Sequence, residues 1–368
     1  MLGCDLEIYV FSRQVNLILH IGTEKTGSTS IQQFMKKNLQ QLKSDGNFVP
    51  QTPMVGSGNH RWIPVFACNN RTDDVFTRSL NLRNNEERKK VILNKRRQFV
   101  DECRNAAKTC KSLILSSEHI QSQLRTIQEI QRLRDLVDEV ADDVCIIIYV
   151  RDPLKMAVSL LSESIKGGGV QVGIHPPDFK RLEHICNHAQ TIQRWQECFP
   201  KAKIIVRRFD RSCLEKGDAV IDFCSQVIDN FHEDKYEFDK PANETLSLTG
   251  MALLRNLNVQ FPMFVGNKPN LMRGKIHDFV MKNTRDGSKF LPCKEEFDAF
   301  KSHFSESCER VRSDYFPLEE SLFIEQTEFA EAKIDLSKVV IDPHILERLV
   351  ELLWRRNRKL ELRLKNTV

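Results

Sequence analysis

Short apolar runs recur along the first part of the chain, and stretches with helical patterning lie between them. The runs cover residues 17–21, 112–116, 144–150 and 202–206. The third run, VCIIIYV, is apolar throughout, as expected of a strand that is buried on both faces of a parallel sheet. Four such strands separated by helices predict an α/β fold, in which a central parallel sheet lies between two layers of helices.

The segments between the apolar runs carry the periodicity and the end signals of helices. We expect helices over residues 29–43, 86–108, 125–140, 153–166, 178–198 and 218–227. Asp152 followed by Pro153 is a good start signal, because aspartate caps a first turn and proline fits the first helical position.

Residues 47–85 are rich in proline and glycine and are expected to be irregular. Long connections of this kind are often functional. His60, Arg61 and Trp62 in this segment could line a pocket for an acceptor substrate, or they could be ordinary residues of a surface loop.

The chain changes character after residue 242, because no further strand is evident there. Helices are expected over residues 246–259, 275–282, 294–312 and 343–364. We therefore expect residues 1–240 to form the α/β core. Residues 241–368 are expected to form a helical portion that packs on this core and covers the active-site cleft.

Composition and charge exclude several kinds of protein. Of the 368 residues, 40% are hydrophobic and 29% are charged, as in an ordinary globular protein. The net charge of +5 suits an anionic ligand but is too small for a dedicated nucleic-acid binder, so no nucleic-acid partner is expected. No run reaches the roughly 18 apolar residues of a membrane span, and the N-terminus lacks a signal-peptide pattern. Eleven scattered cysteines without a C-x-x-C pair indicate reduced thiols, and hence a cytoplasmic protein.

The residues that follow the first predicted strand have the composition of an anion site. Gly22 and Gly27 are five apart, as in the G-x-x-x-x-G of a nucleotide-triphosphate loop. The lysine, however, is Lys25, inside the loop, whereas Ser28 and Thr29 follow the second glycine. In a strand that leads through a turn of small residues into a helix, the backbone N–H groups of the turn and the positive end of the helix point at a bound anion. The displaced lysine, together with the lack of a convincing carboxylate pair for Mg²⁺, argues against ATP phosphoryl transfer.

Further polar residues follow the other predicted strands. They are Glu118–His119, Arg151–Asp152 and Arg207–Arg208. Because ligands of open α/β sheets bind at the carboxyl ends of the strands, these residues and the Lys25 loop are expected to meet at one edge. The sequence thus predicts cationic, phosphate-cradling groups and an acid/base pair in one site.

Two of these segments together resemble the binding motifs of sulfotransferases that use 3′-phosphoadenosine 5′-phosphosulfate. HIGTEKTGSTSIQ, residues 20–32, is similar to the phosphosulfate loop H-I-G-x-x-K-T-G-[ST]-T-S-[LI]-Q of bacterial members. YVRDPLKMAVSLL supplies Arg151 and Ser159 at the eight-residue spacing of the family's second motif. Residues 206–224 are similar to a weaker segment after the fourth strand. The resemblance covers roughly residues 15–228 and implies a P-loop-like core.

The resemblance also implies an activity and roles for single residues. The enzyme would move a sulfuryl group from 3′-phosphoadenosine 5′-phosphosulfate, as co-substrate and without a metal, to a hydroxyl or amine on a glycan or small molecule. Lys25 would reach the oxygen that bridges sulfate and phosphate. The expected binding residues are Gly22, Thr26, Gly27, Ser28 and Thr29 for the 5′-phosphate, and Arg151 and Ser159 for the 3′-phosphate.

The catalytic base of this superfamily is a histidine or a glutamate near the cleft, which points to Glu118 or His119. Alternation along a strand would aim only one of the two into the cleft. Glu118 is favoured because its strand partner Ser116 is small, and His119 or His60 comes next. Glu24 departs from the anion-binding pattern, and could either orient Lys25 or face away.

Other interpretations of the same residues remain. The chain could be a P-loop nucleotide kinase or NTPase, or a non-catalytic nucleotide- or glycan-binding protein on the same fold. His184 and His188 are four apart on a predicted helix, a spacing that can bind zinc, but no third ligand is visible at a sensible spacing. A surface helix is the expected explanation.

Overall fold

The computed structural model describes residues 15–69, 75–80, 84–239, 246–266, 268–285 and 287–365. The chain forms two compact units, and each unit collects separate stretches of the sequence. Unit 1 consists of Met1–Asp152, Glu183–Pro241 and Glu306–Phe323. Unit 2 consists of Pro153–Leu182, Ala242–Ser305 and Ile324–Val368.

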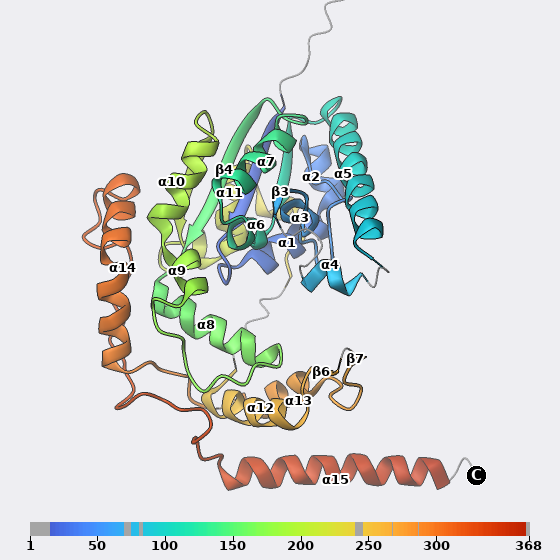
Figure 1. Cartoon of the computed structure of the whole chain (residues 1–368), viewed down its shortest axis with the longest axis vertical. Coiled ribbons are helices and arrows are strands. Elements are labelled where there is room, and N and C mark those ends of the chain that lie inside the picture. The colour runs from blue at the N-terminus through green and yellow to red at the C-terminus, as the bar shows by residue number, and fades with distance from the viewer. Residues whose placement is uncertain are drawn as a thin grey trace, which may run out of the picture. The chain divides into compact units, whose positions relative to one another are not determined.

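Unit 1 is built on a five-stranded sheet with the order β2-β3-β1-β4-β5. Figure 1 labels β3 and β4 of this sheet. All neighbouring strands are parallel. The strands are β1 (Asn16–Gly22), β2 (Asn47–Phe48), β3 (Ser112–Ser116), β4 (Asp143–Val150) and β5 (Lys203–Arg208). The predicted parallel sheet is confirmed. Strand β2 lies in the segment that was expected to be irregular. A strand of two residues is too short to show an alternating pattern, so the sequence did not predict it.

Both faces of the sheet are buried, which explains the continuous apolar runs. Along β1, Leu17, Leu19 and Ile21 belong to one core and Ile18 belongs to the other. The first face packs against α3 (Trp62–Ala67), α5 (Asn85–Ala107), α6 (Glu118–Gln123), α7 (Ile127–Val137) and α10 (His188–Cys198). The second face packs against α1 (Ser28–Lys37), α2 (Leu39–Ser44) and α11 (Ala219–Val227). The three-layer α/β architecture is therefore confirmed.

Two predicted helices are each divided at an asparagine. At Asn38, between α1 and α2, the side-chain amide donates to the carbonyls of Phe34 (2.9 Å) and Glu237 (2.8 Å). At Asn187, between α9 (Lys180–Cys186) and α10, the side chain accepts from the backbone N–H of Gln190 (3.2 Å). Asparagine competes for backbone hydrogen bonds in this way, so the expected helices over 29–43 and 178–198 are wrong in their continuity.

The segment after β2 is more regular than expected. It contains α3 and the short helix α4 (Val75–Ser79), and two single-turn 3₁₀ helices, Glu215–Gly217 and Glu233–Lys235, lie further along unit 1. Trp62 is buried in the core between the sheet and α3, which overrides the loop-like composition around it.

Unit 2 is mainly helical. It contains α8 (Pro153–Lys166), α12 (Leu248–Gln260), α13 (Ile276–Asn283) and α15 (Pro343–Lys365). Helix α14 (Lys294–Tyr315) belongs to unit 2 as far as Ser305. A small hairpin, β6 (Phe264–Val265) and β7 (Lys268–Pro269), was not expected. Asn258 of α12 donates to the carbonyls of Ile165 (2.8 Å) and Gly169 (2.7 Å), which ties α12 to the end of α8. Among the helices described, none is long and apolar enough to cross a membrane.

Candidate active site

The chain leaves two neighbouring strands of the sheet in opposite directions. From β1 it passes to β2 on one side, and from β4 it passes to β5 on the other. Ligands of open α/β sheets bind at the carboxyl ends of strands where the direction reverses in this way. The loop that carries Lys25 follows β1, and Arg151 follows β4, so both lie at this switch point.

Both glycines of the loop are required by its geometry. Gly22 has a φ of +100°, and a Cβ added there would lie 2.9 Å from the Cα of Glu118. Gly27 has a φ of +78°, and an added Cβ would lie 2.8 Å from the Cβ of Ala219. Because any side chain would be both strained and too close, the spacing of the two glycines follows from close backbone packing.

The hydroxyl groups of the loop are used inside it. Thr26 donates to the carbonyl of Thr23 (2.7 Å), and the hydroxyl of Ser28 lies 3.4 Å from the same oxygen. Thr26 and Ser28 are buried, whereas Thr29 is exposed. The hydroxyl groups of Thr26 and Ser28 thus bond within the loop, and the role of these residues at the 5′-phosphate stays a prediction.

The start of α1 is open to an anion. Gly27 stands at its N-cap position and has no side chain with which to cap the first turn. First-turn N–H groups lack intrahelical partners and lie at the positive end of the helix dipole. The backbone at Ser28 and Thr29 can thus serve a phosphate even where the hydroxyl groups do not.

Arg151 contacts the loop directly. Its Nη1 donates to the carbonyl oxygen of Lys25 (2.6 Å), and its guanidinium lies 5.5 Å from the ring centre of Phe209, which follows β5. The group is half-buried, and burial lowers its pKa below the ordinary value. The structure thus brings Arg151 and Lys25 together. Ser159, half-buried on α8, belongs to unit 2, and its joint site with Arg151 stays a prediction.

Glu118 and His119 open helix α6 instead of extending β3. Both side chains are partly exposed, and the Nε2 of His119 lies 3.6 Å from the Oε1 of Glu118. The Glu118 carboxylate accepts hydrogen bonds from the side-chain amides of Gln32 (2.8 Å) and Asn59 (3.0 Å). The argument from strand alternation was wrong, because the chain turns into a helix at this point and places the two side chains next to each other.

His60 is held inside the protein. It is fully buried, its Nδ1 accepts from the N–H of Ser116 (3.0 Å), and its Nε2 donates to the carbonyl of Pro50 (2.9 Å). Burial lowers its pKa from 6.5 to about 4. Arg61 donates to the side chain of Gln123 (2.9 Å), and Trp62 is buried. These three residues fasten their segment to the core, so the idea that they line an acceptor pocket is wrong.

Arg207 and Arg208 are paired with acids of their own unit. Arg207 forms a two-pronged ion pair with the fully buried Asp222, which also accepts from the hydroxyl of Tyr149 (2.7 Å). Arg208 pairs with Glu319 (2.7 Å). Arg207 thus has a buried acidic partner and Arg208 a partly exposed one, and a cationic site at the end of β5 stays a prediction. An aspartate inside the apolar helix AVIDFCSQV is the sequence signal that an internal cation was needed.

Residues that support the candidate base were missed by the sequence analysis. His20 is fully buried beneath the site, where its Nδ1 lies 2.7 Å from the hydroxyl of Ser116 and burial lowers its pKa to about 3. Gln32 and Asn59 hold Glu118, and Asn59 also accepts from the hydroxyl of Ser117 (2.8 Å). His20 and Gln32 belong to the loop motif, so their spacing in the sequence was a signal that they lie at the site. The sequence contains no such signal for Asn59.

Glu24 is half-buried, and its charge favours the protonated form of His184. Burial has the larger effect and lowers the pKa of His184 to about 4. The Nε2 of His184 is hydrogen-bonded to the carbonyl of Gln121 (2.9 Å), and the Nε2 of His188 is hydrogen-bonded to the carbonyl of Arg151 (2.8 Å). The described part of the chain contains no group of three or more metal-ligating side chains.

Comparison with known proteins gives distant similarities. No family model matches the chain. An uncharacterized protein of Archaeoglobus fulgidus is 28% identical over 167 residues, and the match covers 44% of this chain and 45% of that protein. The chain thus matches less than half the length of this relative.

Two solved structures are also similar. One is a sulfotransferase from Alicyclobacillus acidocaldarius, with a TM-score of 0.38 and 10% identity over 82% of this chain and 96% of that one. The other is a sulfotransferase domain from the curacin biosynthetic pathway, with a TM-score of 0.36 and 12% identity over 79% of this chain and 97% of that one. Likeness at this level carries no weight for function, which has to be argued from the residues of the site.

Proposed function

We propose that this chain is a sulfotransferase that moves a sulfuryl group from 3′-phosphoadenosine 5′-phosphosulfate to a hydroxyl or amine acceptor. The observation that carries the proposal is the position of Lys25. It lies inside a glycine-bounded loop at the switch point of the sheet, beside the uncapped start of α1, and Arg151 from the neighbouring strand binds its carbonyl.

The residues of the site fit a donor of this chemistry. Sulfuryl transfer spreads negative charge over the sulfate oxygens and over the leaving phosphate. Lys25 supplies a cation within the loop, and the backbone N–H groups of Ser28 and Thr29 at the start of α1 can supply donors beside it. Pre-placed cations and donors that face developing charge are usually the largest contribution to catalysis. Arg151 can bind a phosphate with two parallel hydrogen bonds, as the family motif requires.

The acceptor has to lose a proton as sulfate arrives, and we propose Glu118 as the base. Two side-chain amides fix its carboxylate, and Gly22 of the loop packs against its Cα. His119, whose Nε2 is 3.6 Å away, is the alternative. We further propose a glycan hydroxyl as the acceptor class, because many members of the resembled family act on saccharides.

A thermal-shift measurement separates this proposal from a P-loop kinase or NTPase. Adenosine 3′,5′-bisphosphate should stabilise the chain, by about 2.7 kcal/mol at a hundredfold excess over its Kd. ATP with Mg²⁺ should give little shift. Stabilisation by ATP with Mg²⁺ alone would overturn the proposal.

Activity separates an enzyme from a non-catalytic binding protein. Radiolabelled donor is incubated with a panel of glycans, lipids and small metabolites, and transfer of label to one acceptor class is expected. A chain that binds the bisphosphate but transfers label to no acceptor, with or without Lys25, would be a binding protein on this fold.

A further inference from the structure

The C-terminal helix α15 carries a regular seam. Residues alternately four and three positions apart are Leu346, Val350, Leu353, Asn357, Leu360 and Leu364. Five of these six are aliphatic, and this spacing is that of the a and d positions of a coiled coil. Leucine occupies every d position, and valine and asparagine occupy the first two a positions.

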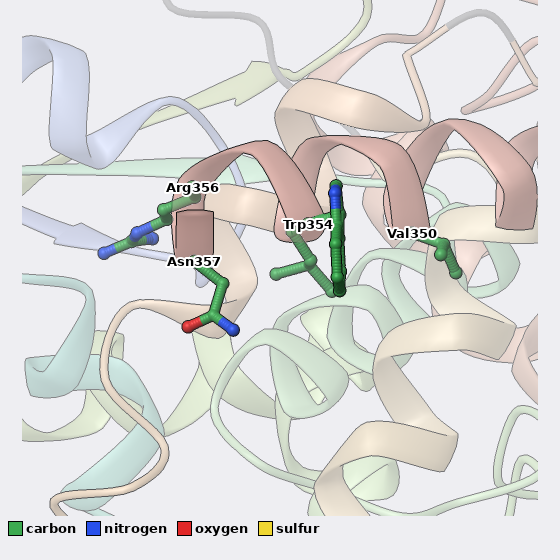
Figure 2. Close-up of a pocket in the computed structure, with 5 residues that line it drawn as sticks. Val350, Trp354, Arg356 and Asn357 are labelled. Carbon is green, nitrogen blue, oxygen red and sulfur yellow. The ribbon is translucent and has the colours of Figure 1, made fainter. Parts of the chain in front are cut away.

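The part of this seam whose side chains are described faces solvent. Val350 is 65% exposed and Leu353 is 51% exposed. Together with Trp354, Arg356 and Asn357 they line an open hollow of about 510 Å³ (Figure 2). Helices in proteins owe most of their stability to the packing of an apolar face, and an exposed apolar stripe is a typical interaction surface.

We propose that α15 pairs in parallel with α15 of a second copy of this chain and forms a short two-stranded coiled coil. Valine at a with leucine at d favours two parallel strands. Asn357 is the one polar residue of the seam, and a single asparagine at an a position pairs with its own copy and fixes register and strand number.

The charges beside the seam agree with this arrangement. Arg356 occupies a g position and Glu361 occupies the e position five residues later. In a parallel pair, the g residue of one helix faces that e residue of the other, so Arg356 can pair with Glu361 of the second copy on both sides of the dimer. Within one chain Glu361 contacts Arg358 (3.0 Å), an exposed pair of small energy that can be exchanged for the new one.

A membrane surface is the rival occupant, because α15 is also rich in arginine and lysine. Asn357 decides against it. An asparagine in the middle of the apolar stripe would have to enter the acyl boundary without a partner, whereas in a coiled coil it bonds its own copy.

Sedimentation velocity of the full chain over a range of about 1–100 μM tests the proposal, since a short coiled coil should dissociate reversibly within such a range. Leu353→Glu should raise the Kd of the dimer about tenfold or more, because it places two charges in the seam. The matched control is Leu352→Glu. Leu352 is 40% exposed on the same helix but lies outside the seam, so this variant should leave the Kd unchanged.

A charge exchange tests orientation. Arg356→Glu should weaken the dimer, and adding Glu361→Arg should restore it. The proposal is overturned by a chain that is monomeric throughout, by equal effects of Leu352→Glu and Leu353→Glu, or by a failure of the exchange to restore pairing. A monomer that sediments with phosphatidylcholine–phosphatidylserine vesicles would assign α15 to a membrane instead. The readout is mass, so it is independent of the proposed activity.

Discussion

At the scale of single residues, Lys25 combines an uncommon backbone conformation with a long-range contact. Its φ is +59°, in the left-handed region that residues other than glycine seldom adopt, and its carbonyl accepts the bond from Arg151. Strain of this kind costs about 1–3 kcal/mol and persists where the surrounding structure enforces it, often at functional sites. The left-handed conformation and the bond from Arg151 together fix the backbone of the loop at Lys25.

Replacing Lys25 by alanine should lower the turnover of sulfuryl transfer by about 10²–10³-fold, because a charge-stabilising group is lost from the transition state. The midpoint of thermal unfolding should stay near that of the parent chain. Lys201→Ala is the control, since Lys201 is exposed at the opposite end of the sheet, just before β5. Transfer of labelled sulfate at the parent rate by the Lys25 variant would remove this residue from the mechanism.

Glu118→Gln should lower turnover by about 10²–10⁴-fold, since a positioned general base contributes that much. The amide keeps the size of the side chain and one oxygen that accepts from Gln32, but its NH₂ group faces the donating amide of Asn59. His119→Gln is measured beside it over a series of pH values. If His119→Gln removes activity and Glu118→Gln does not, the imidazole is the base and the carboxylate only orients it.

At the scale of elements, the loop and the start of α6 form one packed assembly. Gly22 lies against Glu118, and Gly27 lies against Ala219 of α11 and Phe209 after β5. The small residues of the motif therefore serve two purposes, because they allow the left-handed backbone and they let three connections approach one another.

Gly27→Ala should reduce the free energy of unfolding by about 2–4 kcal/mol, since it adds a clash to the cost of a left-handed backbone. Gly56→Ala is the matched control, because Gly56 has a φ of +58° with nothing within 4 Å of an added Cβ. It should lose only the backbone cost of about 1–2 kcal/mol. Urea unfolding followed by the fluorescence of the buried Trp62 and Trp195 measures both. Equal losses in the two variants would show that packing at Gly27 is unimportant.

At the scale of the molecule, unit 1 holds three buried histidines and the half-buried His184 as neutral groups. Burial lowers the pKa of His20 to about 3 and those of His60, His184 and His188 to about 4, from 6.5. Below pH 6.5 the unfolded chain therefore binds protons that the folded chain does not. Stability that is present above pH 6.5 is lost as the pH falls toward 4.

The free energy of unfolding should thus fall by at least about 2 kcal/mol between pH 7 and pH 5, since each such histidine adds up to about 1.4 kcal/mol per pH unit. Denaturant titrations at pH 7, 6 and 5 measure this slope. His184→Gln removes one of these titrating groups, so the slope should fall by the contribution of one proton. Glutamine can still donate to the carbonyl of Gln121, so the contact is kept. Stability that is constant over this interval would mean that the histidines take up protons in the folded chain as readily as in the unfolded chain.

The sequence by itself determined the features that depend on neighbouring residues. Apolar runs gave the four long strands, since a strand buried on both faces has to be apolar throughout. The order of strands and helices gave the parallel three-layer fold. The two glycines and the displaced Lys25 gave the loop, because the backbone turn needs glycine wherever it folds.

Tertiary structure alone decided what depends on partners far away in the chain. Arg207 pairs with Asp222 and Arg208 pairs with Glu319, so both predicted cations have acidic partners from distant parts of the chain. The burial of His60 against β3 removed a candidate base, and Asn59 joined Glu118 from a segment that has no periodicity. Charge and polarity are visible in a sequence, but whether a charged group meets an internal partner or a ligand depends on contacts that only the folded chain creates.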